Sequence, residues 1–219
     1  MQIISNRKEA GYLLAQQLIT QKYENPIVLG MPRGGVVVAY EIAQQLNASL
    51  DVVITRKIGA PSQTELAIGA IAPNDIIILN NELIKNFKIS KSELQKLIHL
   101  EKIELERRTR LYRKNKPPLD IKNNTAILVD DGLATGLTAL AAVQYIRALK
   151  PKKIILAIGA CSSDSAKLLR NKVDEVICLL TPEYFRAVGE WYSDFRQTTD
   201  EEVINLLNIH AFRAPSPGK

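Results

Sequence analysis

Two adjacent carboxylates followed by a short hydroxyl-rich loop are the residues of this sequence best suited to chemistry. An apolar run ends in Asp130 and Asp131, and the chain then passes through a small loop containing Gly136 into a helix-like stretch. The N-terminus of a helix preceded by glycine suits a phosphate, because backbone N–H groups and the helix dipole favour an anion there. Carboxylates accept strong hydrogen bonds from hydroxyl groups. Together the two halves of the segment fit a ribose 5-phosphate.

Other phosphate-binding motifs do not fit this segment. Leu137 stands where the loop GxxxxGK[ST] requires lysine, and the pattern GxGxxG is absent. The structural alternative makes the two acids a turn and the threonines of residues 135–138 a helix cap. A cap does not need an acid pair followed by Thr-Gly-x-Thr, so we favour the ligand-binding interpretation.

The elements that must position the acid pair are short strands alternating with helices. Strand-like runs are expected at residues 26–29, 50–54, 75–79, 125–129, 153–158 and 174–180, and helices at 7–20, 35–46, 137–149, 164–170 and 200–207. The runs are apolar on both faces, as buried parallel strands are. Such alternation predicts an α/β fold with a doubly wound, mostly parallel sheet. Ligands of these sheets bind beyond the carboxyl ends of the strands, where the acid pair falls.

A long charged helix is predicted between two of the core strands. It begins after Ser90, with Glu93 completing a capping box, and ends near residue 114, before two prolines. Nine basic and four acidic residues between positions 90 and 116 give this segment a charge of +5, against +6 for the whole chain. Most of the net charge therefore falls on one helix.

The expected organisation is one domain over residues 1–210. The charged helix would be part of an insertion at about 80–118, the segment at about 181–200 would form a hood over the sheet, and residues 211–219 would be a flexible tail.

Composition bounds the class of protein. The chain has 219 residues, 46% of them hydrophobic and 24% charged, with a mean hydropathy of −0.04, as in globular domains. We expect a cytoplasmic protein without membrane contact, because no secretory signal and no apolar run of about 18 residues is present. Cys161 and Cys178 are interpreted as buried apolar residues, and His99 and His210 as structural. No His, Cys and Asp cluster predicts a fixed metal site.

The segment 127–138 resembles the phosphoribosyl pyrophosphate motif of type I phosphoribosyltransferases, in which two acids and three variable residues precede Thr-Gly-x-Thr. The resemblance implies that Asp130 and Asp131 hold the ribose 2′- and 3′-hydroxyls. The residues that would surround the 5-phosphate are Ala134, Thr135, Gly136, Leu137 and Thr138. It also implies transfer of ribose 5-phosphate to a nitrogenous acceptor, a nucleobase, with release of pyrophosphate. Mg²⁺ would enter with the substrate phosphates, and Asp130 is the side chain that would contact it.

The same resemblance implies two sites for pyrophosphate. One is the loop after the first strand, where Gly34 and Gly35 expose backbone donors and Arg33 offers a planar fork of N–H groups. The other is Arg56 and Lys57, similar to the Arg-Lys-x-Gly stretch of adenine phosphoribosyltransferases. The alternatives are a tight turn for the loop and a solvated charge pair for the two cations. Arg33, Lys57 and the acid pair would be the catalytic residues, and residues 60–72 a mobile lid.

An aromatic cluster marks the expected acceptor site. Five of the aromatic residues lie between positions 184 and 195. In purine-using members of the family a ring from this segment stacks on the base, which implies acceptor binding by Phe185 and Val188. The alternative is a small satellite core. Ala134 stands where hypoxanthine–guanine enzymes carry an aspartate base, which disfavours that class. Over nearly all its length the chain most resembles a bacterial group of phosphoribosyltransferases without an assigned substrate.

Two rival interpretations concern the basic helix. A catalytically silent regulator would sense phosphoribosyl pyrophosphate and bind nucleic acid through residues 90–116, with an affinity that falls steeply with salt. Alternatively, an apolar stripe on the helix would mediate a homodimer; its residues are Leu94, Leu97, Ile98 and Leu105.

Overall fold

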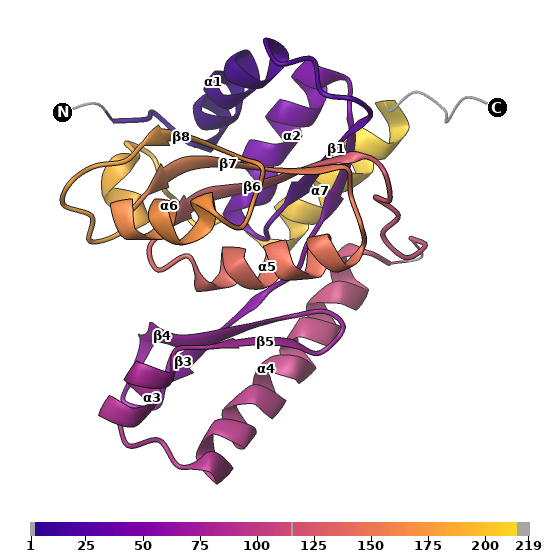
Figure 1. The fold of residues 1–219 in the computed structure, drawn as a ribbon. Coiled ribbons are helices and arrows are strands. Elements are labelled where there is room, and N and C mark those ends of the chain that lie inside the picture. Colours follow the sequence, from indigo (N-terminus) through magenta and orange to yellow (C-terminus); the bar gives the residue numbers. More distant parts are fainter. Residues whose placement is uncertain (1–2, 115, 214–219) are drawn as a thin grey trace.

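A parallel five-stranded sheet forms the centre of the protein, as seen in a computed structural model that describes residues 3–114 and 116–213 (Figure 1). Its strand order is β2-β1-β6-β7-β8, and every neighbouring pair is parallel. The strands are β1 (Pro26–Gly30), β2 (Ser49–Val52), β6 (Thr125–Leu133), β7 (Lys153–Cys161) and β8 (Glu175–Leu180). The predicted class, α/β with a doubly wound and mostly parallel sheet, is confirmed.

Helices cover both faces of this sheet. They are α1 (Arg7–Ile19), α2 (Gly34–Leu46), α5 (Leu137–Ala148), α6 (Ser163–Arg170) and α7 (Asp200–Arg213). Figure 1 shows α1 and α2 above the sheet and α5 below it. Successive residues of β6 show why the strands carry apolar residues on both faces: Ile127 packs in the core on the side of α1, α2 and α7, whereas Leu128 packs in the core that contains α5.

The expected sixth strand of the parallel sheet, residues 75–79, was a wrong prediction. Those residues form β5 (Ile76–Leu79), at the edge of a separate antiparallel sheet with β3 (Arg56–Ala60) and β4 (Gln63–Ala72). The turn before β5 is made by Asn74 and Asp75, whose φ angles are 60° and 57°. Two such residues in succession favour a tight hairpin, and a short apolar run does not itself distinguish the two kinds of sheet.

The antiparallel sheet, α3 (Asn81–Asn86) and α4 (Lys91–Tyr112) make up a lobe that we call the flap lobe, residues 56–112. It lies below α5 in Figure 1, and Ala70 of β4 packs against Ala141 of α5. This excursion starts well before the insertion predicted at 80–118, because β3 and β4 belong to it. The expected lid, residues 60–72, is the β3–β4 turn followed by β4.

Helix α4 begins as predicted, since the Ser90 hydroxyl accepts a hydrogen bond from the Glu93 N–H at 3.2 Å. The apolar stripe of α4 contributes to the main core: Leu105 is buried, and the other three residues of the stripe are partly buried against that core. At the other end of the chain, α7 continues to Arg213, three residues into the predicted tail. Residues 214–219 lie outside the described part. Within residues 3–114 and 116–213, no helix combines the length and hydropathy needed to cross a membrane.

Candidate functional site

The acid pair lies at the carboxyl end of β6, in the middle of the parallel sheet. The strand continues through both acids to Leu133, because Asp130 is in register with Ile158 of β7 and Leu133 with Cys161. The Asp131 N–H donates to Asp130 Oδ1 at 2.9 Å. Removal from water and then the charge of Asp131 raise the pKa of Asp130 well above its ordinary value.

The predicted pyrophosphate loop packs directly on the acid pair. A Cβ added at Gly34 would lie 1.9 Å from Asp131 Oδ2, and one added at Gly35 would lie 2.9 Å from Asp130 Oδ1. Any larger residue at these positions would collide with the carboxylates, so glycine is required by the close approach. The peptide bond between Pro32 and Arg33 is cis. The structure thus brings together two loops that are about 100 positions apart in the sequence.

Arg33 extends from this loop toward two helices. Its Nη1 lies 3.6 Å from Asp200 Oδ1 at the start of α7, and the Tyr112 hydroxyl of α4 donates to the same oxygen at 2.6 Å. Burial and this hydrogen bond raise the pKa of Tyr112, so the phenol remains a donor. The pyrophosphate loop is therefore connected to the flap lobe through Asp200.

Arg56 and Lys57 lie in the flap lobe, each beside an acid. Arg56 Nε is 2.8 Å from Glu101 Oε2 of α4, and Lys57 Nζ is 3.0 Å from Glu65 Oε2 of β4. Within the described residues, no hydrogen bond or ion pair joins either cation to the acid pair. Because the Glu65 side chain is 96% exposed, its contact with Lys57 is of the kind that contributes little stability.

The predicted phosphate loop leads into α5 without a side-chain cap. Gly136 has a φ of 71° and occupies the N-cap position, so the first N–H groups of α5 have no side-chain acceptor there. The loop is held from α6 instead, because the hydroxyls of Ser162 and Ser165 both donate to the Ala134 carbonyl at 2.9 Å. Sequence reasoning missed these serines, although Ser-x-x-Ser at a helix start is a recognisable capping pattern.

The expected hood packs onto the ends of β6 and β7. A Cβ at Gly132 would lie 2.2 Å from a Val188 methyl, which places that valine against the strand. Phe185 stacks on Trp191 with ring centroids 6.3 Å apart, and Tyr192 contacts Phe195 at 5.1 Å. Four of the five aromatic residues thus pack in or against the main core and not in a separate satellite core; they are Phe185, Trp191, Tyr192 and Phe195. The fifth, Tyr184, is 81% exposed. Binding of an acceptor by Phe185 and Val188 stays a prediction.

Two further side chains contact Asp131, and the sequence analysis identified neither. Arg7 Nε is 2.6 Å from Asp131 Oδ2, and the Tyr192 hydroxyl donates to the Asp131 backbone carbonyl at 2.7 Å. Burial raises the pKa of Tyr192, which keeps the phenol protonated. Arg7 comes from the first turn of α1, 124 positions before Asp131, and no local pattern marks it.

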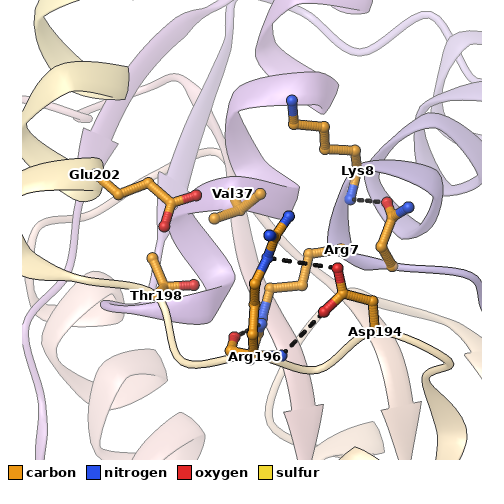
Figure 2. Close-up of a pocket in the computed structure, with 8 residues that line it drawn as sticks. Arg7, Lys8, Val37, Asp194, Arg196, Thr198 and Glu202 are labelled. Carbon is orange, nitrogen blue, oxygen red and sulfur yellow. Dashed lines mark hydrogen bonds and ion pairs between the residues drawn. The ribbon is translucent and has the colours of Figure 1, made fainter.

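Beside Arg7 lies a cavity of about 280 Å³, drawn in Figure 2. Side chains of both charges line it, from α1, the hood and α7; among them are Arg7, Lys8, Asp194, Arg196 and Glu202. In the part of the chain that the structure describes, no three His, Cys, Asp or Glu side chains gather as a metal-ion cluster would. Cys161 is buried, and its Sγ lies 2.9 Å from that of Cys178.

Comparisons with known proteins agree with this geometry. A family model described as "Phosphoribosyl transferase domain" matches residues 3–194. A Mycobacterium tuberculosis H37Rv protein named "Putative phosphoribosyl transferase" is 39% identical over 208 residues, which are 95% of this chain and 47% of that protein. The chain thus spans about half the length of this relative.

Two solved structures are similar to this chain in fold. The crystal structure of TT1426 from Thermus thermophilus is 37% identical, with a TM-score of 0.77 over 94% of this chain and 98% of that one. The AQ2163 protein from Aquifex aeolicus, at 13% identity, has a TM-score of 0.53 over 84% of this chain and 78% of its own. The second likeness concerns the fold alone.

Proposed function

Because the chain belongs to the phosphoribosyl transferase domain family, we propose that it transfers ribose 5-phosphate from phosphoribosyl pyrophosphate to a nitrogenous acceptor. The leaving group is pyrophosphate, and the acceptor class is a nucleobase. One observation carries the proposal: Gly34 and Gly35 lie against Asp130 and Asp131 at the carboxyl ends of β1 and β6. A loop suited to an anion and a carboxylate pair suited to hydroxyl groups would thus serve one substrate.

The ribose 5-phosphate would occupy the end of β6. Asp130 and Asp131 accept hydrogen bonds from the 2′- and 3′-hydroxyls, and the uncapped N–H groups at the start of α5 bind the 5-phosphate. The hydrogen bonds from Ser162 and Ser165 to the Ala134 carbonyl support this role, since they hold the loop in place before the substrate arrives.

Pyrophosphate would be bound by the loop at residues 33–35 and by the cations of the flap lobe. Arg33 and Lys57 now face Asp200 and Glu65, and both ion pairs are partly solvated. Surface pairs of this kind are worth about 0–1 kcal/mol, so a polyanionic substrate can replace the carboxylates at little cost. The cations would then stabilise negative charge on the departing pyrophosphate, with Arg56 beside them.

Mg²⁺ would arrive bound to the substrate phosphates. Asp130 suits it, since carboxylate oxygens are the ligands that Mg²⁺ prefers and this side chain forms no ion pair within the described residues. The ion would neutralise charge on the leaving group. The protein's own contribution is to position the ribose, its 5-phosphate and the pyrophosphate.

The acceptor would enter from the side of the hood, near Phe185 and Val188. Phe185 is only partly buried, although its ring stacks on that of Trp191. Ala134 in the phosphate loop cannot take a proton, so this position supplies no general base.

The rival hypothesis of a nucleic-acid-binding regulator has less support. Six of the nine basic residues between positions 90 and 116 form ion pairs with acids, so part of the charge of this segment is compensated; they are Lys102, Arg107, Arg108, Arg110, Arg113 and Lys116. A phosphate backbone would have to compete with these partners.

Pyrophosphate release from Mg²⁺–phosphoribosyl pyrophosphate, assayed over a panel of purines, pyrimidines and small amines, tests the proposal. The variant carrying both Asp130→Asn and Asp131→Asn is the control. Release that needs one acceptor and disappears in this variant is expected. Tight substrate binding without release for any acceptor would instead favour the regulator, and absence of binding would refute both.

A further inference from the structure

The N-terminal segment is fixed to the hood by backbone hydrogen bonds. The Ile4 N–H donates to the Trp191 carbonyl at 3.0 Å, and the Ile4 carbonyl accepts from the Ser193 N–H at 2.8 Å. One residue further, the Ser5 carbonyl accepts from the Asp194 N–H at 2.9 Å. Arg7 follows closely, as the first residue of α1. Its backbone is therefore held between the hood and the helix.

The Arg7 side chain is held on three sides. Besides its contact with Asp131, Nη1 donates to the Arg196 carbonyl at 2.8 Å. The guanidinium also lies 4.0 Å above the centre of the Phe195 ring, within the range of a cation–π contact. The Arg7 and Asp131 side chains are only 11% and 13% exposed, so the pair is shielded from solvent.

These contacts leave Asp131 little freedom. Arg7 engages Oδ2, Tyr192 engages the backbone carbonyl, and Gly34 lies where even a methyl group would strike the carboxylate. In the part of the chain that the structure describes, no N–H or hydroxyl group donates to Oδ1, and the only other group that hydrogen-bonds to the Asp131 carboxylate is the neighbouring carboxyl of Asp130. One oxygen of Asp131 is thus restrained, and the other is available to accept a hydrogen bond.

We infer that Arg7 is a positioning residue: it holds the Asp131 carboxylate so that Oδ1 accepts the ribose hydroxyl of phosphoribosyl pyrophosphate. This inference rests on the proposed function. A carboxylate already fixed in its binding rotamer loses little entropy when the substrate binds, which raises affinity without adding a contact to the substrate. Arg7 itself acts through Asp131.

The test is binding of Mg²⁺–phosphoribosyl pyrophosphate by calorimetry to Arg7→Ala, Arg7→Lys and a matched control, Arg196→Ala. The Arg196 side chain is 88% exposed, and Arg7 uses only its backbone carbonyl, so this control removes a nearby cation without disturbing the contact. We expect Arg7→Ala to weaken binding about 10- to 100-fold, Arg7→Lys to restore part of the loss, and Arg196→Ala to change affinity less than about twofold.

A double-mutant cycle with Asp131→Asn separates positioning from a general structural effect. If Arg7 acts through Asp131, its removal costs less than about threefold in affinity once Asp131 is asparagine. An equal loss in both backgrounds would overturn the inference, as would unchanged or tighter binding by Arg7→Ala. Should Arg7→Ala fail to fold, the cycle is run with Arg7→Lys. A wild-type protein that does not bind the substrate would instead refute the proposed function, and this inference with it.

Discussion

Substituting Gly159 by alanine should release the hood from the acid pair. Gly159 lies in β7, and a Cβ there would be 1.9 Å from the Tyr192 hydroxyl oxygen and 2.6 Å from the Asp131 carbonyl oxygen. These are the two atoms of the 2.7 Å hydrogen bond between Tyr192 and Asp131. Ordinary contacts begin near 3.4 Å, so the ring would have to move by about 1.5 Å and the hydrogen bond would break.

The expected loss in the free energy of unfolding caused by Gly159→Ala has two parts. Leaving two buried polar atoms without each other costs about 1–3 kcal/mol, and forcing a methyl group into a packed site costs about 1–3 kcal/mol. Gly159→Ala should therefore lower the free energy of unfolding by about 2–6 kcal/mol, against a total of about 5–15 kcal/mol for an ordinary domain. Urea denaturation followed by circular dichroism measures it.

A double-mutant cycle with Tyr192→Phe tests whether the methyl group added at Gly159 acts through the Tyr192 hydroxyl. Phenylalanine lacks the hydroxyl, so in that background the nearest remaining ring atom would be the one 3.1 Å from the added Cβ. The cost of Gly159→Ala should then fall by at least about 1 kcal/mol. Costs that add within about 0.5 kcal/mol would show that the methyl group does not act through the hydroxyl, and would refute the argument.

Three further perturbations are informative. The hydrogen bond from Arg107, assisted by Arg108, lowers the pKa of Glu104 from 4.5 to about 2. The ionised Glu104 therefore contributes stability above pH 4.5, and this contribution is lost as the pH falls toward 2. Glu104→Gln should make the urea midpoint fall less steeply over this pH range. Gly136→Ala places a side chain at a φ of 71° and should cost about 1–2 kcal/mol, visible as a melting temperature lower by about 2–8 °C. Lys57→Gln should leave stability within about 1 kcal/mol, because its ion pair is exposed, while slowing pyrophosphate release in the acceptor assay.

The parallel sheet could be predicted because its central strands are buried on both faces and three of the four connections between its strands are a single helix. Residues 125–129 and 153–158 are apolar throughout most of their length, and the structure places both in the centre of the sheet. The acid pair extends β6 beyond its apolar part, because backbone pairing with β7 continues regardless of side-chain polarity. Residue patterns show where a strand is buried, and they show less well where its hydrogen bonding stops.

The flap lobe was harder to predict for a physical reason. Strand β3 begins with Arg56 and Lys57, and β4 is polar up to Glu65, so only the second half of β4, residues 66–72, is a continuous apolar run. One short apolar run does not by itself identify an antiparallel sheet. Arg7 was out of reach for a different reason: its partner Asp131 is 124 positions away, and only the folded chain brings α1 to the end of β6. Local residue spacing can predict the acid pair and the loop that follows it, whereas a residue that contacts the acid pair comes from a distant segment.

Helix α4 is anchored at the end nearest the pyrophosphate loop. Arg113 Nη2 lies 3.0 Å from Asp51 Oδ2 on β2, and Tyr112 shares Asp200 with Arg33. Farther along the helix, Leu100 and Ile103 are 62% and 54% exposed, so that part has less contact with the body of the protein. A helix fixed at one end and attached to β3 through Arg56 and Glu101 joins the cations of the flap lobe to the loop that holds Arg33. The ion pairs of α4 therefore connect the flap lobe to the loop that holds Arg33.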